Sequence, residues 1–268
     1  MIALEFDRIS HEFGTPDGRT YCAVRDVSFA VPAGQFLAIV GPSGCGKSTL
    51  LNVAAGLLKP SSGRVTVDGR PLDGLNRAAT YMFQQDALLP WKTVRENVAL
   101  GLALAGAPRA DATARADNWL AKVGLSGFGR HFPGQLSGGM RKRVAVAQNW
   151  IIDRDILLMD EPFSALDLHT RQRMESELLA LWEELRRTIV LVTHDLEEAI
   201  ALADEVLVLS AGPAGRVVAR HRVPLARPRD VLDLRTDAAF VDLYRAIWAD
   251  LREQVITSQR QGQTELRA

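Results

Sequence analysis

The segment at residues 41–48 constrains this chain more than any other part of its sequence. It reads Gly-Pro-Ser-Gly-Cys-Gly-Lys-Ser, with four residues between the first glycine and Gly46-Lys47-Ser48. A mostly apolar run at 35–40 precedes it, and residues suited to a helix follow at 48–58. A strand, a glycine-rich loop and a helix in this order direct backbone N–H groups and the positive end of a helix dipole at one anion. The sequence therefore predicts a phosphate-binding loop after a buried strand of a parallel sheet.

Two side chains of the loop would complete this site. Lys47 would reach the β- and γ-phosphates of a nucleotide, and Ser48 would coordinate magnesium. A glycine-rich turn that binds nothing is the alternative, and the strand and helix on either side disfavour it. Cys45 occupies a variable position of the pattern and is interpreted as structural. The expected nucleotide-binding residues of the loop are Gly41, Pro42, Ser43, Gly44, Cys45, Gly46, Lys47, Ser48 and Thr49.

A second apolar strand, at 156–159, ends in the acidic residues Asp160 and Glu161. This pattern places two carboxylates at the edge of the sheet where α/β proteins bind ligands. Asp160 would hold magnesium through water, and Glu161 would polarise the attacking water. Acids at a solvated strand end are the alternative, which the upstream phosphate loop makes the weaker one.

The sequence Leu-Ser-Gly-Gly at 136–139 precedes a helical stretch and is a further candidate anion site. By itself this signal is weak, because Ser137 and the glycines could simply cap the helix. The histidines at 11, 131, 169 and 221 are interpreted as polar surface residues. His194 differs from them because it directly follows the apolar strand at 188–192.

Hydrophobic patterning predicts alternating strands and helices along the chain. Turns are expected at Asp17-Gly18 and Asp68-Gly69. Strands are expected at 2–6, 24–31, 35–40, 64–67, 156–159, 188–192 and 206–209. Helices are expected at 48–58 (stopped by Lys59-Pro60), 93–121 (interrupted at Pro108), 137–150, 170–187 and 238–255, followed by a polar tail.

Taken together, these motifs resemble the ATP-binding subunit of ABC transporters. Gln84 in Tyr-Met-Phe-Gln-Gln resembles the Q-loop glutamine, and His194 in Val-Thr-His-Asp resembles the switch histidine. Ser-Ala-Leu-Asp at 164–167 resembles the D-loop. Order and spacing agree from about residue 2 to 209. Met140 departs from the family, which most often has glutamine there, but leaves Ser-Gly-Gly intact.

The resemblance implies an α/β fold with a P-loop NTPase (RecA-like) core, an antiparallel β subdomain and an inserted helical subdomain at about 91–150. The ATPase domain would span 1–230, and a C-terminal helix and polar tail would span 231–268.

It also implies ATP and Mg²⁺ as cofactors and a composite site shared by two ATPase subunits, either two copies of this chain or this chain and a homologue. Ser137, Gly138 and Gly139 would touch the γ-phosphate bound by the other subunit. Gln84 would join Ser48 and Asp160 at the metal, and Glu161 and His194 would be catalytic. An aromatic side chain should stack on adenine, and Phe13 is preferred over Tyr21.

Further features resemble the subfamily that imports nitrate, sulfonate, taurine or bicarbonate. They are Ala-Leu-Leu-Pro-Trp at 87–91, Ser-Gly-Gly-Met-Arg at 137–141 and Pro228-Arg229. The implied protein is a peripheral subunit at the cytoplasmic face of the plasma (inner) membrane. It would drive solute uptake through separate permease subunits, supplied by a solute-binding protein. The segment 88–91 would dock on the permease or, alternatively, be buried as core.

Composition limits the alternatives. The 268 residues carry 32 basic and 32 acidic side chains, so the chain lacks the strong positive field of a nucleic-acid coat. The two cysteines do not make a secreted disulfide framework, and neither a signal peptide nor a membrane span is expected. A soluble ABC ATPase acting on ribosomes or DNA is disfavoured by the single phosphate loop, the neutral charge and the lack of heptads. An exporter or lipid-transport ATPase stays open, and a small-molecule kinase is disfavoured by the Ser-Gly-Gly motif.

Overall fold

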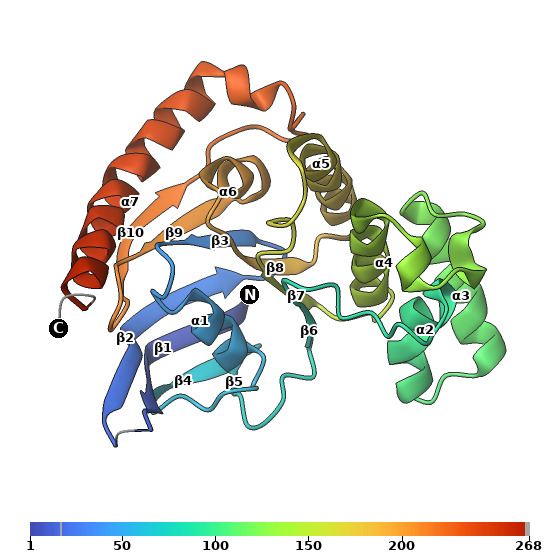
Figure 1. Cartoon of the computed structure of the whole chain (residues 1–268), viewed down its shortest axis with the longest axis horizontal. Coiled ribbons are helices and arrows are strands. Elements are labelled where there is room, and N and C mark those ends of the chain that lie inside the picture. The colour runs from blue at the N-terminus through green and yellow to red at the C-terminus, as the bar shows by residue number, and fades with distance from the viewer. Residues whose placement is uncertain (17, 266–268) are drawn as a thin grey trace.

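The computed structural model describes residues 1–16 and 18–265, and the predicted turn residue Asp17 lies outside them. The strands form two β-sheets, and helix α1 (Lys47–Ala54) lies between these sheets (Figure 1). The described part of the chain therefore has the predicted α/β architecture with a separate antiparallel sheet.

The smaller sheet is antiparallel and has the strand order β2-β1-β4-β5. Its long hairpin, β1 (Ile2–Gly14) and β2 (Thr20–Pro32), contains the two predicted N-terminal strands, and Phe6 stacks on Phe29 across it at 4.2 Å. The strands β4 (Ser62–Val67) and β5 (Arg70–Pro71) continue the sheet beyond β1.

The larger sheet has the order β10-β9-β3-β8-β7-β6, and all its strands are parallel except β10. The strands run over β3 (Phe36–Val40), β6 (Ala79–Met82), β7 (Ile156–Asp160), β8 (Thr188–Val192), β9 (Glu205–Leu209) and β10 (Val217–Arg222). Every residue of β3 is buried, because this central strand has packed layers on both faces.

Alternation along β3 divides the core into two layers. Phe36, Ala38 and Val40 face a layer built with helices α4 to α7, whereas Leu37 and Ile39 face α1 and the antiparallel sheet. The period of two along a strand explains why a continuous apolar run is needed here.

Three helices form the lobe on the right of Figure 1, namely α2 (Val94–Leu104), α3 (Arg109–Lys122) and α4 (Gly138–Trp150). Pro108 is the N-cap of α3, as its punctuation of the helical pattern predicts. Helix α5 (Leu168–Leu185) packs beside α4, and α7 (Ala238–Glu265) runs along β9 and β10. Short 3₁₀ turns lie at Phe128–Arg130, Pro133–Gln135 and Leu234–Thr236, the last of which is η3.

Several expectations about local structure were wrong. Helix α1 ends at Ala54, before the Lys59-Pro60 stop. The chain leaves the helical conformation at Gly56, which adopts φ +70° and approaches Gly74 so closely that a Cβ at Gly56 would lie 1.9 Å from the Gly74 oxygen. Helix α7 continues past Val255 to Glu265. Strands β6 and β10 and helix α6 (Leu196–Leu202) were not predicted. Helix α6 is buried along almost its whole length, so it lacks the polar face from which a short helix is recognised.

The expectation that four histidines are surface residues was also wrong in part. His11 is only 8% exposed, and its Nδ1 lies 3.1 Å from the Lys59 carbonyl oxygen. His131 and His221 are half-buried, and His221 Nε2 lies 2.7 Å from Asp250 Oδ2 of α7. His11 sits at an inward position of β1, which alternation along the strand makes a buried one.

Candidate nucleotide site

The parallel strands of the large sheet end at one edge, and the sequence motifs follow those ends. The phosphate loop follows β3, Gln84 follows β6, Asp160 ends β7, and His194 follows β8. Because the carboxyl ends of parallel strands share an edge, residues more than a hundred positions apart meet there. This edge is the candidate site.

Strand β2 packs closely against the phosphate loop. Gly46, the N-cap of α1, adopts φ +97°, and a Cβ there would lie 2.3 Å from Val24 Cγ1. Only glycine fits this conformation and this gap. Cys45 is fully buried, which raises the pKa of its thiol and agrees with a structural role.

Lys47 lies within the loop rather than in solvent. It is 7% exposed, and its ammonium donates to the carbonyl oxygens of Gly41 at 2.8 Å and Pro42 at 3.0 Å. A buried cation requires such partners. The geometry therefore places a fixed positive charge beside the N-terminus of α1.

Asp160 is tied to two hydroxyl groups. Ser48 Oγ donates to Asp160 Oδ1 at 3.0 Å, and the Tyr81 hydroxyl donates to Asp160 Oδ2 at 3.2 Å. Burial raises the pKa of Asp160 although both bonds favour its charged form. Burial and the nearby Asp160 also raise the pKa of Tyr81, which therefore stays a hydrogen-bond donor.

Hard oxygen donors of this kind suit Mg²⁺, which is typically held by one or two carboxylates together with waters and substrate phosphates. Within residues 1–16 and 18–265, no cluster of three or more His, Cys, Asp or Glu side chains could hold a metal on its own. The side-chain oxygens of Ser48 and Asp160, which lie 3.0 Å apart, are donors of the type that Mg²⁺ prefers.

Glu161 gathers the other polar groups of the edge. His194 Nδ1 lies 3.1 Å from Glu161 Oε2, and Gln84 Nε2 donates to the same oxygen at 3.5 Å. Gln84 Nε2 also donates to Ser164 Oγ at 3.4 Å. Glu161 adopts φ +44°, an unusual conformation for a residue with a side chain, and its N–H donates to the Val192 carbonyl oxygen at 2.9 Å. The structure thus brings Glu161, His194 and Gln84 together, as expected from the sequence.

The Ser-Gly-Gly motif lies elsewhere. Ser137 caps α4 by accepting from the Met140 N–H at 3.3 Å. Ser137, Gly138 and Gly139 line a hollow of about 590 Å³ together with residues 165–167, and no phosphate-loop residue lines it. Within one chain, the Ser-Gly-Gly motif and the phosphate loop therefore do not line a common hollow.

Two basic side chains of α4 contact the segment that contains Gln84 and Asp86. Lys142 is buried, and its ammonium donates to the Gln84 carbonyl oxygen at 2.6 Å and pairs with Asp86 at 2.9 Å. Arg141 Nε lies 3.3 Å from the other Asp86 oxygen. No role was predicted for these residues from the sequence, in which the Arg-Lys-Arg run after Met140 was the available signal.

Of the two candidate aromatics, Tyr21 contacts the phosphate loop. Its hydroxyl donates to the Gly44 carbonyl oxygen at 3.2 Å. Phe13 is its cross-strand partner and packs edge-on against His11 at 4.5 Å. Both rings are about equally exposed, at 39% for Phe13 and 40% for Tyr21.

The loop between β9 and β10 packs against the phosphate loop, a contact that was not predicted from the sequence. A Cβ at Gly212 would lie 2.6 Å from the Gly44 oxygen, and a Cβ at Gly215 would lie 2.0 Å from the Cys45 oxygen. The Gly215 N–H donates to the Ala23 carbonyl oxygen at 3.0 Å. Glycines at these positions permit the close backbone approach, and the Gly-Pro-Ala-Gly sequence at 212–215 was the available signal.

We expect Gly215→Ala to weaken ATP binding about tenfold and to lower the free energy of unfolding by about 1–3 kcal/mol, because the new methyl group must displace the Cys45 peptide. Isothermal titration calorimetry and urea unfolding would measure both. Gly134→Ala is the matched control, because a Cβ there meets nothing within 4 Å. Equal ATP affinity in the two variants would contradict the supporting role of this loop.

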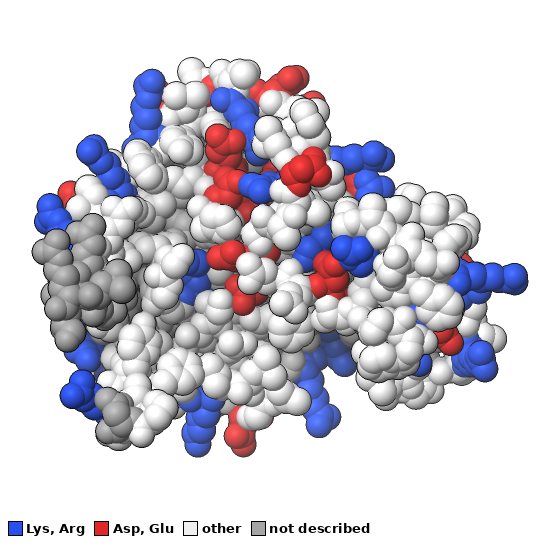
Figure 2. Space-filling model, viewed as in Figure 1, with Lys and Arg blue, Asp and Glu red and all other residues white. Residues whose placement is uncertain are grey.

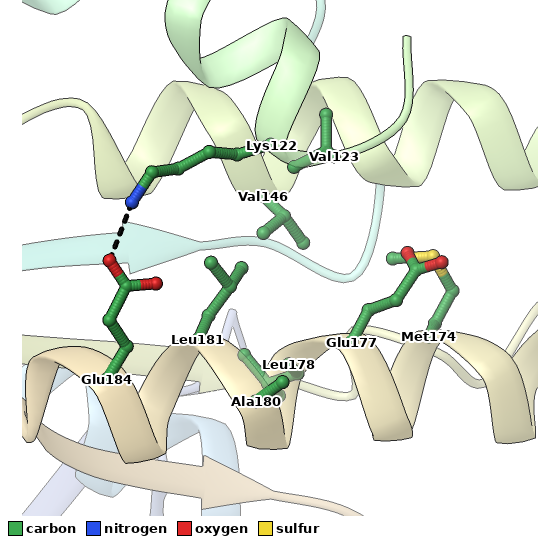
Figure 3. Close-up of a pocket in the computed structure, with 9 residues that line it drawn as sticks. All are labelled: Lys122, Val123, Val146, Met174, Glu177, Leu178, Ala180, Leu181 and Glu184. Carbon is green, nitrogen blue, oxygen red and sulfur yellow. Dashed lines mark hydrogen bonds and ion pairs between the residues drawn. The ribbon is translucent and has the colours of Figure 1, made fainter.

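A second cavity, of about 250 Å³, lies apart from the candidate site. Figure 3 shows its apolar side chains from α5 and from the helical lobe, with Lys122 reaching across to Glu184. That ion pair measures 2.8 Å. None of the predicted site residues lines this cavity.

The segment 88–91, expected either to dock on a permease or to be buried as core, is partly exposed and partly buried. Trp91 is 72% exposed, whereas Leu88 packs against the core. The backbone of Leu89 is held by the side chain of buried Asn97. Among the described helices, none has the length and apolarity to cross a membrane.

Comparison with known proteins shows which family this chain belongs to. Residues 24–164 match the family model described as ABC transporter. The chain is 44% identical over 252 residues to a taurine import ATP-binding protein of Rhizobium johnstonii, covering 92% of this chain and 96% of that one. It is 41% identical over 269 residues to a taurine import ATP-binding protein of Pseudomonas putida, covering 99% of both chains.

Solved structures give the same result. The dimeric structure of a bacterial ABC transporter cassette superimposes with a TM-score of 0.73 at 30% identity, covering 83% of this chain and 100% of that one. A post-hydrolysis state of the same cassette, bound to ADP and phosphate, matches equally well. The family model matches more than half of the chain and the relatives match nearly all of it, so the chain belongs to the ATP-binding subunits of the ABC transporter family and is an ATP-hydrolysing cassette.

Proposed function

We propose that this chain powers a solute importer by binding and hydrolysing ATP between two ATPase subunits. One observation carries the proposal, namely the separation of the phosphate loop from the Ser-Gly-Gly hollow within a single chain. Two subunits packed head to tail would bring each loop opposite the Ser-Gly-Gly helix of the other and so complete two sites. The dimeric cassette among the similar structures supports this arrangement.

In the proposed site, the residues 41–49 bind the phosphates of ATP. Ser48, Asp160 and Gln84 hold Mg²⁺, which when bound neutralises charge on the β- and γ-phosphates. Ser137, Gly138 and Gly139 of the opposite subunit contact the γ-phosphate through backbone N–H groups at the start of α4.

Glu161 is the proposed group that orients the attacking water. Its Oε2 is already the shared partner of His194 and Gln84, so the carboxylate is directed into the site. His194, exposed enough to reach a ligand, would hold the γ-phosphate while the water is positioned. Positioning and charge stabilisation are the main demands of phosphoryl transfer.

The relatives named taurine import ATP-binding proteins support a sulfonate such as taurine as the transported solute. The chain would lie on the cytoplasmic face of the membrane, bound to permease subunits that take solute from a binding protein. Exposed Trp91 and its neighbours are the proposed contact with the permease. On the face shown in Figure 2, acidic and basic side chains are interspersed, which does not favour a nucleic-acid partner.

A tagged copy of the chain should co-purify with a polytopic membrane protein from detergent-solubilised native membranes. Reconstitution of that complex in liposomes, with ATP inside and the solute-binding protein outside, should then support taurine uptake, measured with radiolabelled taurine and, in parallel, with labelled nitrate and bicarbonate. Uptake of another solute would overturn the substrate assignment only. Co-purification with ribosomes or DNA instead of a permease would overturn the transport function.

We expect Tyr21→Ala to raise the KM for ATP about tenfold, which is typical for loss of one aromatic ring stacked on a base. The reason to favour this ring is its contact with the Gly44 carbonyl. Phe13→Ala is the matched comparison, because the two rings face each other across one hairpin. If Phe13→Ala alone raised the KM, Phe13 would be the adenine-stacking residue, as expected from the sequence.

A further inference from the structure

The loop that carries His194 is anchored to a very short helix. Helix α6 has 7 residues, and Asp195 caps it by accepting from the N–H groups of Glu197 at 2.9 Å and Glu198 at 3.2 Å. A helix of this length is not stable on its own, so contacts with other elements must set its orientation. The position of His194 therefore depends on what holds α6.

Two buried carboxyl groups lie behind this loop. Glu198 of α6 accepts a short hydrogen bond from the Thr193 hydroxyl, and Glu175 of α5 is 0% exposed. In each of them, Oε1 is buried without a hydrogen-bond partner. Buried carboxylates require compensating cations.

One of the compensating cations comes from the C-terminal part of the chain. Arg235, in η3, donates from Nη2 to Glu175 Oε2 at 3.2 Å, and its Nε lies 3.1 Å from Glu197 Oε2. Its side chain is only 15% exposed. Arg235 thus joins α5 to the N-terminal end of α6.

The second cation is Arg171 of α5. It pairs with Asp195 at 2.8 Å and donates to the Leu166 carbonyl oxygen in the D-loop at 3.1 Å. At the other end of α6, buried Arg229 donates to the carbonyl oxygens of Ala201 at 3.0 Å and Ala203 at 2.8 Å. The segment that contains Arg229 and Arg235 therefore holds α6 at both ends.

We propose that Arg235 is a positioning residue for hydrolysis, which holds α6 and the loop before it so that His194 stays within reach of Glu161. The proposal rests on the roles assigned above to His194 and Glu161. Arg235 does not itself touch the nucleotide edge and acts only through its partners Glu175 and Glu197.

The electrostatics of the cluster make this role measurable. Burial raises the pKa of Glu175 to about 7, Arg235 and Arg171 oppose that rise, and Asp195 and Glu197 add to it. Burial also raises the pKa of Glu198 to about 8, to which Glu175 contributes. The ion pair of Arg235 with Glu175 is therefore present above the pKa of Glu175 and is lost as the pH falls through it. Removing Arg235 should raise that pKa further.

The experiment compares kcat and KM for ATP hydrolysis between pH 6 and pH 9 in the full-length protein. In Arg235→Gln, we expect kcat near pH 7.5 to fall about fivefold, the size typical of an indirect coupling, with little change in KM. We also expect kcat of this variant to fall less on acidification than that of the wild type, because the ion pair that protonation of Glu175 would break is already absent. Arg235→Lys should restore much of both. Arg245→Gln is the matched control, because that exposed arginine forms an ion pair at 3.5 Å with Asp242 of the same helix, α7.

Thermal unfolding of each variant separates positioning from misfolding. If Arg235→Gln does not fold, Glu197→Gln replaces it, because this half-exposed partner can be neutralised without burying an unpaired charge. A smaller loss of kcat in the same direction is then expected. An unchanged kcat and pH profile in the folded variant would overturn the positioning role while leaving the ATPase function in place. Absence of hydrolysis by the wild type would instead overturn the proposed catalytic function.

Discussion

Replacement of Glu161 by glutamine is expected to lower the steady-state rate of ATP hydrolysis about a hundredfold or more, the range typical of losing a proton-accepting group at the reaction centre. Glutamine keeps the size of the side chain and can still contact His194 and Gln84, which lie 3.1 Å and 3.5 Å from the present carboxylate oxygen. It cannot accept a proton from the attacking water. Binding of ATP should therefore be preserved, and a subunit dimer should accumulate in ATP.

The measurement is phosphate release together with size-exclusion chromatography in ATP and Mg²⁺. Glu253→Gln on the exposed side of α7 is the control for loss of one negative charge. A Glu161→Gln variant that turns over ATP like the wild type would show that Glu161 is not the catalytic carboxylate. Loss of ATP binding in the same variant would assign Glu161 to binding instead.

Replacement of Lys47 by alanine is expected to weaken ATP binding about 10- to 100-fold, which corresponds to the loss of a charged hydrogen-bond donor to phosphate. The backbone N–H groups of the loop stay in place, so some affinity should persist. In the structure, the ammonium donates to Gly41 and Pro42 at 2.8 Å and 3.0 Å, so the variant also leaves two carbonyl groups without that donor. A modest loss of stability, about 1–3 kcal/mol, should accompany it.

Calorimetric titration with ATP would measure the affinity, and urea unfolding would measure the stability. Lys59→Ala is the control, because this exposed lysine lies beyond the end of α1. If the Lys47→Ala variant bound and hydrolysed ATP as well as the wild type, the assignment of residues 41–48 as the phosphate loop would be wrong.

The strongest sequence signals came from segments in which the backbone conformation or the burial of the segment itself restricts which residue types fit. The loop at 41–48 requires glycines for its backbone, and Gly46 indeed adopts φ +97°. The apolar runs at 156–159 and 188–192 required burial on both faces, and both are strands of the large sheet. Because parallel strands end at one edge, the two apolar runs predicted that Asp160, Glu161 and His194 lie near each other. Gln84 was assigned to the same site only through the family resemblance, because strand β6 before it was not predicted.

Predictions from the sequence failed where burial on all sides removed the alternation of polar and apolar residues. Helix α6 was missed because it has almost no polar face, and His11 was assigned to the surface although its strand turns it inward. The early end of α1 at Ala54 depends on Gly56 meeting the backbone of Gly74, a contact that neither residue reveals alone.

By itself, the sequence determined the class of fold, the phosphate loop and the order of the motifs along the chain, because these follow from backbone conformation and from periodic burial. Only the tertiary structure decided which supporting groups surround them. Tyr21 rather than Phe13 contacts the phosphate loop. Lys142 donates to the backbone of Gln84, and Arg235 donates to Glu175, from which it is separated by 60 positions along the chain. Such contacts join side chains from different elements, and their energies depend on burial and distance in space, which spacing along a chain does not contain.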